Sequence, residues 1–144
     1  MVGILLIGSG AREVAIARKI KESSYSTLLY CVASTTNPQI KNLSEQYFEQ
    51  SPSEISSVLR SIKGLAINLA IIGPENPLEV GLVDALEEVG IPCVGPKKDV
   101  AKIETSKSFA RNILDRCSPE KNPERKEFFS IDGVEDFLQH LNGE

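Results

Sequence analysis

The chain has few of the residues that mark disulfide-rich, zinc-binding or nucleic-acid-binding proteins. Its 144 residues include one histidine, His140, and three cysteines, Cys31, Cys93 and Cys117. The cysteines are odd in number and not closely paired, so they indicate neither a disulfide framework nor a metal site, and we expect a reducing, cytoplasmic location. The formal net charge of -4 argues against the dense cationic surface that nucleic-acid binding requires.

Long apolar segments are also missing. The first apolar run, 2–7, is too short and too soon followed by glycine and charge to be a signal peptide, and no later run approaches membrane-spanning length. We therefore expect a protein that is neither exported nor anchored, with no membrane partner. The length and the ordinary shares of apolar and charged residues, 41% and 25%, predict one globular domain, with or without a piece of a second.

Strand-like and helix-like segments alternate along the first two thirds of the chain. Short apolar runs predict strands over 2–7, 27–33, 66–72 and 92–94. Helical spacing of apolar residues predicts helices over 12–23, from 51 to Gly64, from 76 to Gly90, and around 100–103 and 106–114. This order predicts an α/β fold with an open, mostly parallel, Rossmann-like sheet and helices on both faces.

The composition changes after Cys117. Residues 118–126 are polar and contain two prolines, which is typical of a linker or loop. A strand over 127–130 and a helix over 134–141 are expected to follow, and together they are too small to bury a core of their own. We interpret this tail as the opening of a second domain.

The first strand ends in a glycine-containing turn. Gly8, Ser9 and Gly10 allow a tight bend, and the helix that starts near Arg12 presents free N–H groups to an anion such as phosphate. Arg12 could add a bidentate contact. NAD binding is disfavoured, because Glu13 stands where a third glycine would be and no acidic residue ends the second strand. The alternative is that the glycines serve only the geometry of the turn.

A second turn, Gly73-Pro74-Glu75-Asn76-Pro77, follows the third predicted strand. Two prolines fix the backbone on either side of Glu75, whose carboxylate could accept hydrogen bonds from sugar hydroxyls or an amine. Alternatively, Glu75 favours the helix dipole and Asn76 caps the helix. Because parallel strands end at the same edge of a sheet, we expect the two turns to line one crevice.

Three motifs in this order resemble those of the phosphoribosylamine-glycine ligases. They are Gly8-Ser9-Gly10-Ala11-Arg12-Glu13, then Ile71 to Leu78, then Val94-Gly95-Pro96 with Glu104 to Ala110. The resemblance covers nearly the whole chain. It departs from the family pattern at Ala11 and Val14, where a second glycine and a histidine are usual, and in Ser34 to Pro38, which replaces a Pro-Gly-Asn segment.

The resemblance implies an ATP-grasp ligase of purine synthesis that joins glycine to 5-phosphoribosylamine. Residues 1–103 would be its substrate-binding amino-terminal (pre-ATP-grasp) domain and 104–144 the incomplete beginning of an ATP-grasp domain. Lys107 would reach a nucleotide phosphate, whereas the sites for ATP and Mg lie mostly beyond this chain, which holds no catalytic residue or metal ligand. The substrate would be bound by two groups of residues, Gly8, Ser9, Gly10, Arg12 and Glu13, and Gly73, Pro74 and Glu75.

Catalysis by such a ligase needs ATP, magnesium, glycine and the amine held together, so we expect the isolated chain to be inactive. Two alternatives stay open. The chain could be a free-standing module that binds a nucleotide or phosphosugar, or a decayed ligase fragment in which the carboxylates and glycines serve only as caps and turns.

Overall fold

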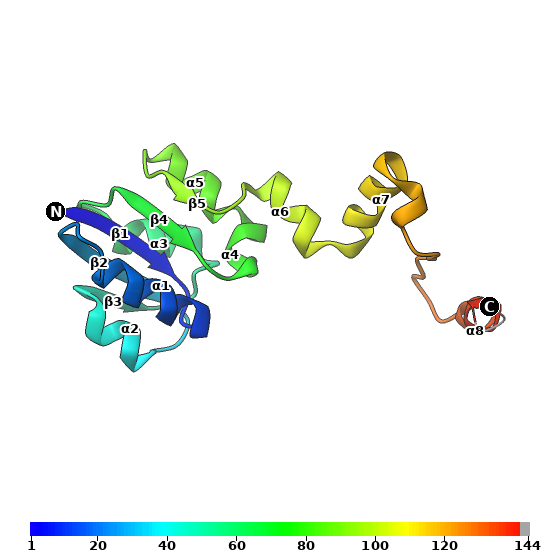
Figure 1. Ribbon diagram of the computed structural model, residues 1–144, viewed down its shortest axis with the longest axis horizontal. Helices are drawn as coiled ribbons and strands as arrows, with labels where there is room; N and C mark the ends of the chain where they lie inside the picture. The colour runs from blue at the N-terminus through cyan, green and yellow to red at the C-terminus, as the bar shows by residue number, and fades with distance from the viewer. Residues whose placement is uncertain (142–144) are drawn as a thin grey trace. The chain divides into compact units, whose positions relative to one another are not determined.

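The computed structural model describes residues 1–141, which form two compact units that divide between Thr105 and Ser106. The first unit contains a five-stranded sheet in the order β3-β2-β1-β4-β5, and every neighbouring pair of strands is parallel (Figure 1). The strands are β1 (Val2–Ile7), β2 (Thr27–Ala33), β3 (Gln46–Glu49), β4 (Leu69–Ile72) and β5 (Cys93–Val94). The predicted open parallel α/β fold is confirmed.

Helices cover both faces of this sheet. Those of the first unit are α1 (Ala11–Lys21), α2 (Pro38–Leu43), α3 (Ile55–Ser61), α4 (Glu75–Val80), α5 (Leu82–Glu88) and α6 (Lys98–Thr105). On one face, Leu6 of β1 belongs to a buried cluster with Ile20 of α1 and Ile40 of α2. On the other face, Leu5 belongs to a cluster with Val58 of α3 and Leu86 of α5. Successive residues of β1 therefore enter different cores, which explains its continuous apolar sequence.

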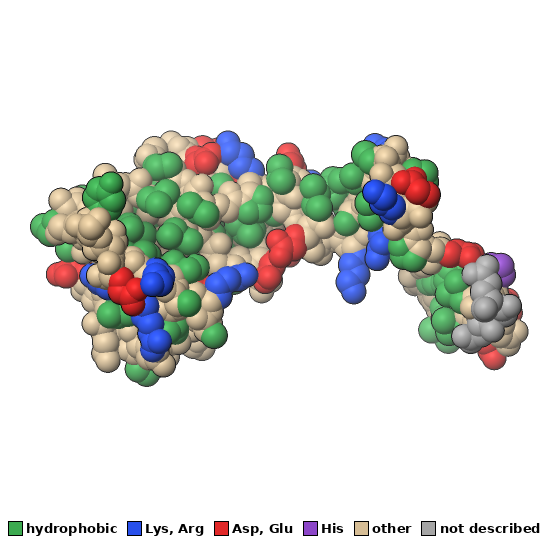
Figure 2. All heavy atoms as spheres, viewed as in Figure 1, with side chains coloured by type: hydrophobic (Ala, Val, Ile, Leu, Met, Phe, Trp, Pro, Cys, Tyr) green, Lys and Arg blue, Asp and Glu red, His purple; other side chains and the backbone are tan. Residues whose placement is uncertain are grey.

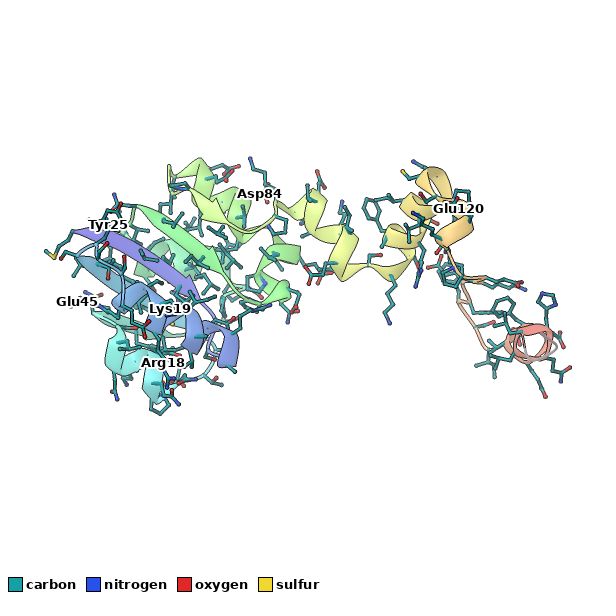
Figure 3. All side chains as sticks on the ribbon, viewed as in Figure 1. Arg18, Lys19, Tyr25, Glu45, Asp84 and Glu120 are labelled. Atoms are coloured by element: carbon teal, nitrogen blue, oxygen red, sulfur yellow. The ribbon has the colours of Figure 1, made fainter. Side chains whose placement is uncertain are left out.

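The helices after β4 differ from the single helix that the sequence predicts. Gly81 has a φ of 96°, in the left-handed region, and separates α4 from α5. The segment begins at Glu75 with Pro74 as its N-cap, so Asn76 lies inside α4 and does not cap it. Further along, the Oδ2 atom of Asp84, labelled in Figure 3, accepts a hydrogen bond of 2.9 Å from the backbone N–H of Lys98 and ties α5 to the start of α6.

The sequence analysis did not predict two elements of the structure, the helix α2 and the strand β3. Asn37 caps α2, because its side chain accepts a hydrogen bond of 3.0 Å from the backbone N–H of Gln39. The short strand β3 then pairs with β2 at the edge of the sheet. Two predicted elements are shorter in the structure: the helix expected from residue 51 begins at Ile55, and the strand expected from residue 66 begins at Leu69.

The second unit contains α7 (Lys107–Cys117), a single 3-10 turn (Pro119–Lys121) and α8 (Val134–Leu141). The loop after α7 is held by Arg125, which donates hydrogen bonds of 2.6 Å to Asn112 and to Asp115. The predicted strand over 127–130 is wrong: those residues are irregular, and Phe129 is 96% exposed. Neither α7 nor α8 has a buried residue in this unit over 106–141, as expected of a segment too short to form a core.

Candidate functional site

A cleft of about 380 Å³ lies at the carboxyl ends of the strands. Its walls come from the turns after β1, β2, β3 and β4, so four segments far apart in the sequence meet there. The lining residues are Gly8, Ser9, Gly10, Glu13, Ser34, Ser51, Pro52, Ser53, Pro74, Asn76 and Pro77. The chain leaves β1 toward β2 on one side of the sheet centre and later returns to β4 on the other side. The cleft is therefore at the topological switch point, where open α/β sheets usually bind ligands.

The turn after β1 is shaped by its glycines and by Glu13. Gly8 has a φ of 113°, which favours glycine, and Gly10 is the N-cap of α1. Glu13, three residues on, accepts a hydrogen bond of 2.7 Å at Oε2 from the backbone N–H of Gly10. The carboxylate of a glutamate at this position satisfies an N–H group that the helix leaves free, and it fixes where α1 begins.

Arg12 and Glu13 connect this turn to the turn after β4. Glu13 is 5% exposed, and its Oε1 atom accepts a hydrogen bond of 3.1 Å from Nε of Arg12. Nη2 of Arg12 donates a second hydrogen bond to the backbone carbonyl of Gly73, 61 residues away in the chain. The Arg12 side chain is 60% exposed, so its remaining N–H groups face solvent near the cleft.

A polar network around Asn37 connects the turn after β1 to the segment after β2. Its Nδ2 atom donates a hydrogen bond of 2.8 Å to the backbone carbonyl of Ser9, and the hydroxyls of Ser9 and Thr35 lie 3.1 Å apart. The hydroxyl of Tyr47 donates to the carbonyl of Thr35 at 2.6 Å and accepts from the N–H of Asn37 at 3.2 Å. Burial raises the pKa of the Tyr47 hydroxyl above its ordinary value.

The structure brings together most of the residues that the sequence predicts for the site. Gly8, Ser9, Gly10, Glu13 and Pro74 line the cleft. Arg12 and Gly73 do not line it but contact each other beside it, and Glu75 is exposed and lies outside the lining.

Sequence analysis missed Ser34, Ser51, Pro52 and Ser53 as lining residues. Asn76 and Pro77 also line the cleft; they belong to the turn that was expected there but were not named as substrate-binding residues. The signal that could have identified the serines is their position directly after β2 and β3, but β3 itself was not predicted.

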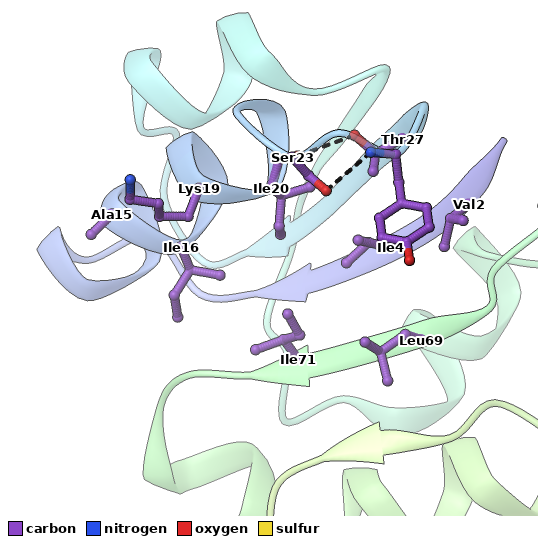
Figure 4. Close-up of a pocket in the computed structure, with 11 residues that line it drawn as sticks. Val2, Ile4, Ala15, Ile16, Lys19, Ile20, Ser23, Thr27, Leu69 and Ile71 are labelled. Atoms are coloured by element: carbon purple, nitrogen blue, oxygen red, sulfur yellow. Dashed lines mark hydrogen bonds between the residues drawn. The ribbon is translucent and has the colours of Figure 1, made fainter.

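A larger apolar groove of about 730 Å³ lies on the sheet face beside α1 (Figure 4). Ile16 and Ile20 of α1 face Ile4 of β1 and Ile71 of β4 across it, and hydrophobic side chains gather over β1 and β4 in Figure 2. Lys19, labelled in Figure 3, lies at its edge and is paired with Glu22 at 2.6 Å. Because a phosphosugar needs polar partners, the strand-end cleft is the better candidate for such a ligand.

Lys107 is the first residue of α7 in the second unit. It is exposed, and the preceding Ser106 caps the helix by accepting a hydrogen bond of 3.2 Å from the N–H of Phe109. Over residues 1–141, no group of three or more His, Cys, Asp or Glu side chains is arranged to hold a metal ion. None of the helices described is long and apolar enough to cross a membrane.

The sequence is similar to known proteins over nearly its whole length. The family model described as "Phosphoribosylglycinamide synthetase, N domain" matches residues 2–104. The phosphoribosylamine-glycine ligase of Methanosarcina barkeri is 42% identical over 138 residues, which is 96% of this chain and 32% of that protein. The chain thus spans about a third of the length of this curated relative.

Solved structures share the fold at lower identity. Phosphoribosylglycinamide synthetase from Anaerococcus prevotii aligns with a TM-score of 0.62 at 14% identity, over 80% of this chain and 28% of that one. N5-carboxyaminoimidazole synthetase from Staphylococcus aureus, complexed with ADP, aligns with a TM-score of 0.68 at 10% identity, over 99% and 36% of the two chains. These structures share the fold alone, whereas the family match over residues 2–104 shows that the chain belongs to the phosphoribosylglycinamide synthetase N-domain family.

Proposed function

We propose that this chain is the amino-terminal part of an ATP-dependent ligase that joins glycine to 5-phosphoribosylamine in de novo purine biosynthesis. Its role would be to bind the phosphoribosyl group of the amine. The observation that carries the proposal is the cleft at the switch point of the sheet, formed by four strand-end turns in a chain of this family. The odd number of cysteines supports a cytoplasmic location.

The two kinds of polar group around the cleft match the two halves of a phosphoribosyl group. The N–H groups in the first turn of α1 and the exposed guanidinium of Arg12 suit a phosphate. The hydroxyls of Ser34, Ser51 and Ser53 on the opposite wall suit the hydroxyls of a ribose. In this assignment Gly8, Ser9, Gly10 and Pro74 are beside the ligand, and Glu75 is not.

The ligase reaction itself needs groups that we do not assign to this chain. ATP, when bound, would activate the carboxylate of glycine, and we propose that 104–144 begin the ATP-grasp region and that Lys107 approaches a nucleotide phosphate. The structurally similar Staphylococcus aureus enzyme is described as complexed with ADP, which supports the use of ATP by the whole ligase. Because catalysis needs ATP, magnesium, glycine and the amine held together, we expect this part alone to bind the substrate without turning it over.

Titration calorimetry with ribose 5-phosphate tests the binding role, with ribose and inorganic phosphate as separate titrants. We expect ribose 5-phosphate to bind more tightly than either fragment, because it fills both halves of the cleft. Arg12→Ala should weaken binding about tenfold, since a charge-assisted hydrogen bond contributes about 1.5 kcal/mol or more.

Arg18→Ala is the matched control for Arg12→Ala. Arg18 lies on the same helix but outside the cleft, where it donates a hydrogen bond of 2.5 Å to Gln39. Both variants remove one arginine, so they change the net charge of the chain equally. We expect its affinity to stay within twofold of the unmodified chain. Absence of binding, or equal losses in the two variants, would overturn the proposal; tighter binding of an unrelated nucleotide would favour a free-standing module instead.

A further inference from the structure

Three glycines from two distant turns surround one side chain, that of Glu13. A Cβ atom on Gly73 would lie 2.1 Å from Oε1 of Glu13, and a Cβ atom on Gly10 would lie 2.8 Å from its Oε2. A Cβ atom on Gly8 would lie 3.0 Å from Cγ of the same side chain. Gly10 has an ordinary φ of -77°, and Gly73 is not among the residues with positive φ, so backbone conformation does not explain glycine at those two positions. The space that they leave is filled by Glu13.

The carboxylate of Glu13 is bonded to both turns, directly on one side and through Arg12 on the other. It accepts from the N–H of Gly10 at 2.7 Å and from Nε of Arg12 at 3.1 Å, and Arg12 donates to the carbonyl of Gly73. A carboxylate that is 5% exposed is retained at low cost only when such partners satisfy it. Changing the length of this side chain must therefore move one turn relative to the other.

We infer that Glu13 is a positioning residue that sets the separation between the turns after β1 and β4, and thereby the width of the cleft. Gly73 is its matched partner, since only a residue without a side chain leaves room for the carboxylate. Glu13 acts on a ligand through the two turns, in contrast to the substrate contact that the sequence resemblance implies. The effect on ligand affinity rests on the proposed function, whereas the contact between Glu13 and Gly73 does not.

A double-mutant cycle on the chain tests this contact. Gly73→Ala should lower the urea midpoint, because its Cβ overlaps Oε1 of Glu13. In Glu13→Ala the overlap is gone, so adding Gly73→Ala to it should shift the midpoint no further. Additive shifts would overturn the inference. If Gly73→Ala does not fold, Gly10→Ala replaces it in the same cycle, because its Cβ would meet Oε2 of the same carboxylate.

Val58→Ala is the control for non-additivity. Val58 is fully buried in the cluster that contains Leu5, on the sheet face away from the cluster that contains Ile20 of α1, and it belongs to neither turn. Combined with Glu13→Ala, its midpoint shift should add to that of Glu13→Ala. Non-additivity there as well would mean that the cycle reports general weakening of the unit, and the inference would fail.

Two conservative variants separate positioning from direct contact. Glu13→Gln keeps the length of the side chain and an oxygen that can accept from Gly10, whereas Glu13→Asp keeps the charge but is one methylene shorter. We expect the loss of ribose 5-phosphate affinity to be smaller for Gln than for Asp, which should lose about tenfold. The reverse order would show that charge matters and length does not, and would overturn the inference. If the unmodified chain does not bind ribose 5-phosphate, the proposed function fails, and the urea cycle still decides the contact.

Discussion

Asn37 joins the start of α2 to the turn after β1, so its removal should weaken both. In Asn37→Ala the helix α2 loses its N-cap. The lost hydrogen bond, which the Asn37 side chain accepts from the N–H of Gln39, contributes about 1 kcal/mol to the free energy of unfolding. The bond to the carbonyl of Ser9 is lost as well and contributes about 1 kcal/mol. We expect the free energy of unfolding to fall by about 2 kcal/mol in total.

Urea unfolding followed by tyrosine fluorescence measures this loss in the first unit alone, because Tyr25, Tyr30 and Tyr47 all precede Ser106 and the chain has no tryptophan. For a slope of about 2 kcal/mol per molar urea, the midpoint should fall by about 1 M. Asn37→Asp is the control, because aspartate caps helices well but cannot donate to Ser9, and it should lose about half as much. A midpoint for Asn37→Ala within 0.2 M of the unmodified chain would refute this reasoning, as would equal losses in the two variants.

Four further predictions concern the core, a helix break, the reactivity of the cysteines and the dependence of stability on pH. Leu5→Ala should lower the free energy of unfolding by about 3 kcal/mol in the same assay, because Leu5 is fully buried between the sheet and its helices. Gly81→Ala should lower the free energy of unfolding by about 1 kcal/mol or more, since its φ of 96° disfavours alanine. Gly90→Ala is the control for steric overlap: its φ is 83° but the space around it is open, so a similar loss there would show that the backbone conformation is the cause. Burial raises the pKa of Cys31 to about 12 and that of Cys93 to about 11, so at pH 8 a thiol reagent should modify exposed Cys117 first and Cys31 only after unfolding; equal rates would contradict this. Because the pKa of Cys31 is higher in the folded state than its ordinary 9.0, its contribution to stability is present below pH 9 and should be lost as pH rises toward 12, seen as a falling urea midpoint.

The elements that sequence analysis predicted well are those specified by neighbouring residues. The strand β1 is a continuous apolar run because both of its faces are buried, and α1 follows a glycine turn and has apolar residues at helical spacing. The edge strand β3 was missed, because Gln46–Glu49 has polar ends and only half-buried centres. A strand was wrongly expected over 127–130, since a local apolar pattern does not reveal whether another strand is available to pair with it.

The residues of the site likewise divide into those that the local sequence reveals and those that only the fold brings together. The turns after β1 and β4 were found because glycine and proline have local conformational meaning. Ser34 and Ser53 were missed because their place on the cleft wall depends on the order of strands in the sheet, which the sequence does not reveal. The partners of Glu13 were missed for a similar reason: the carbonyl to which Arg12 donates belongs to Gly73, 61 residues further along the chain than Arg12.

The central claim is that the strand-end cleft binds a phosphoribosyl group, and amide chemical-shift mapping with ribose 5-phosphate tests it most directly. A saturable titration should shift the amide signals of Ser9, Gly10, Ser34 and Ser53, which line the cleft, and leave those of Ile16 and Ile71 in the apolar groove unchanged. Shifts confined to the groove, or none at millimolar ligand, would contradict the account.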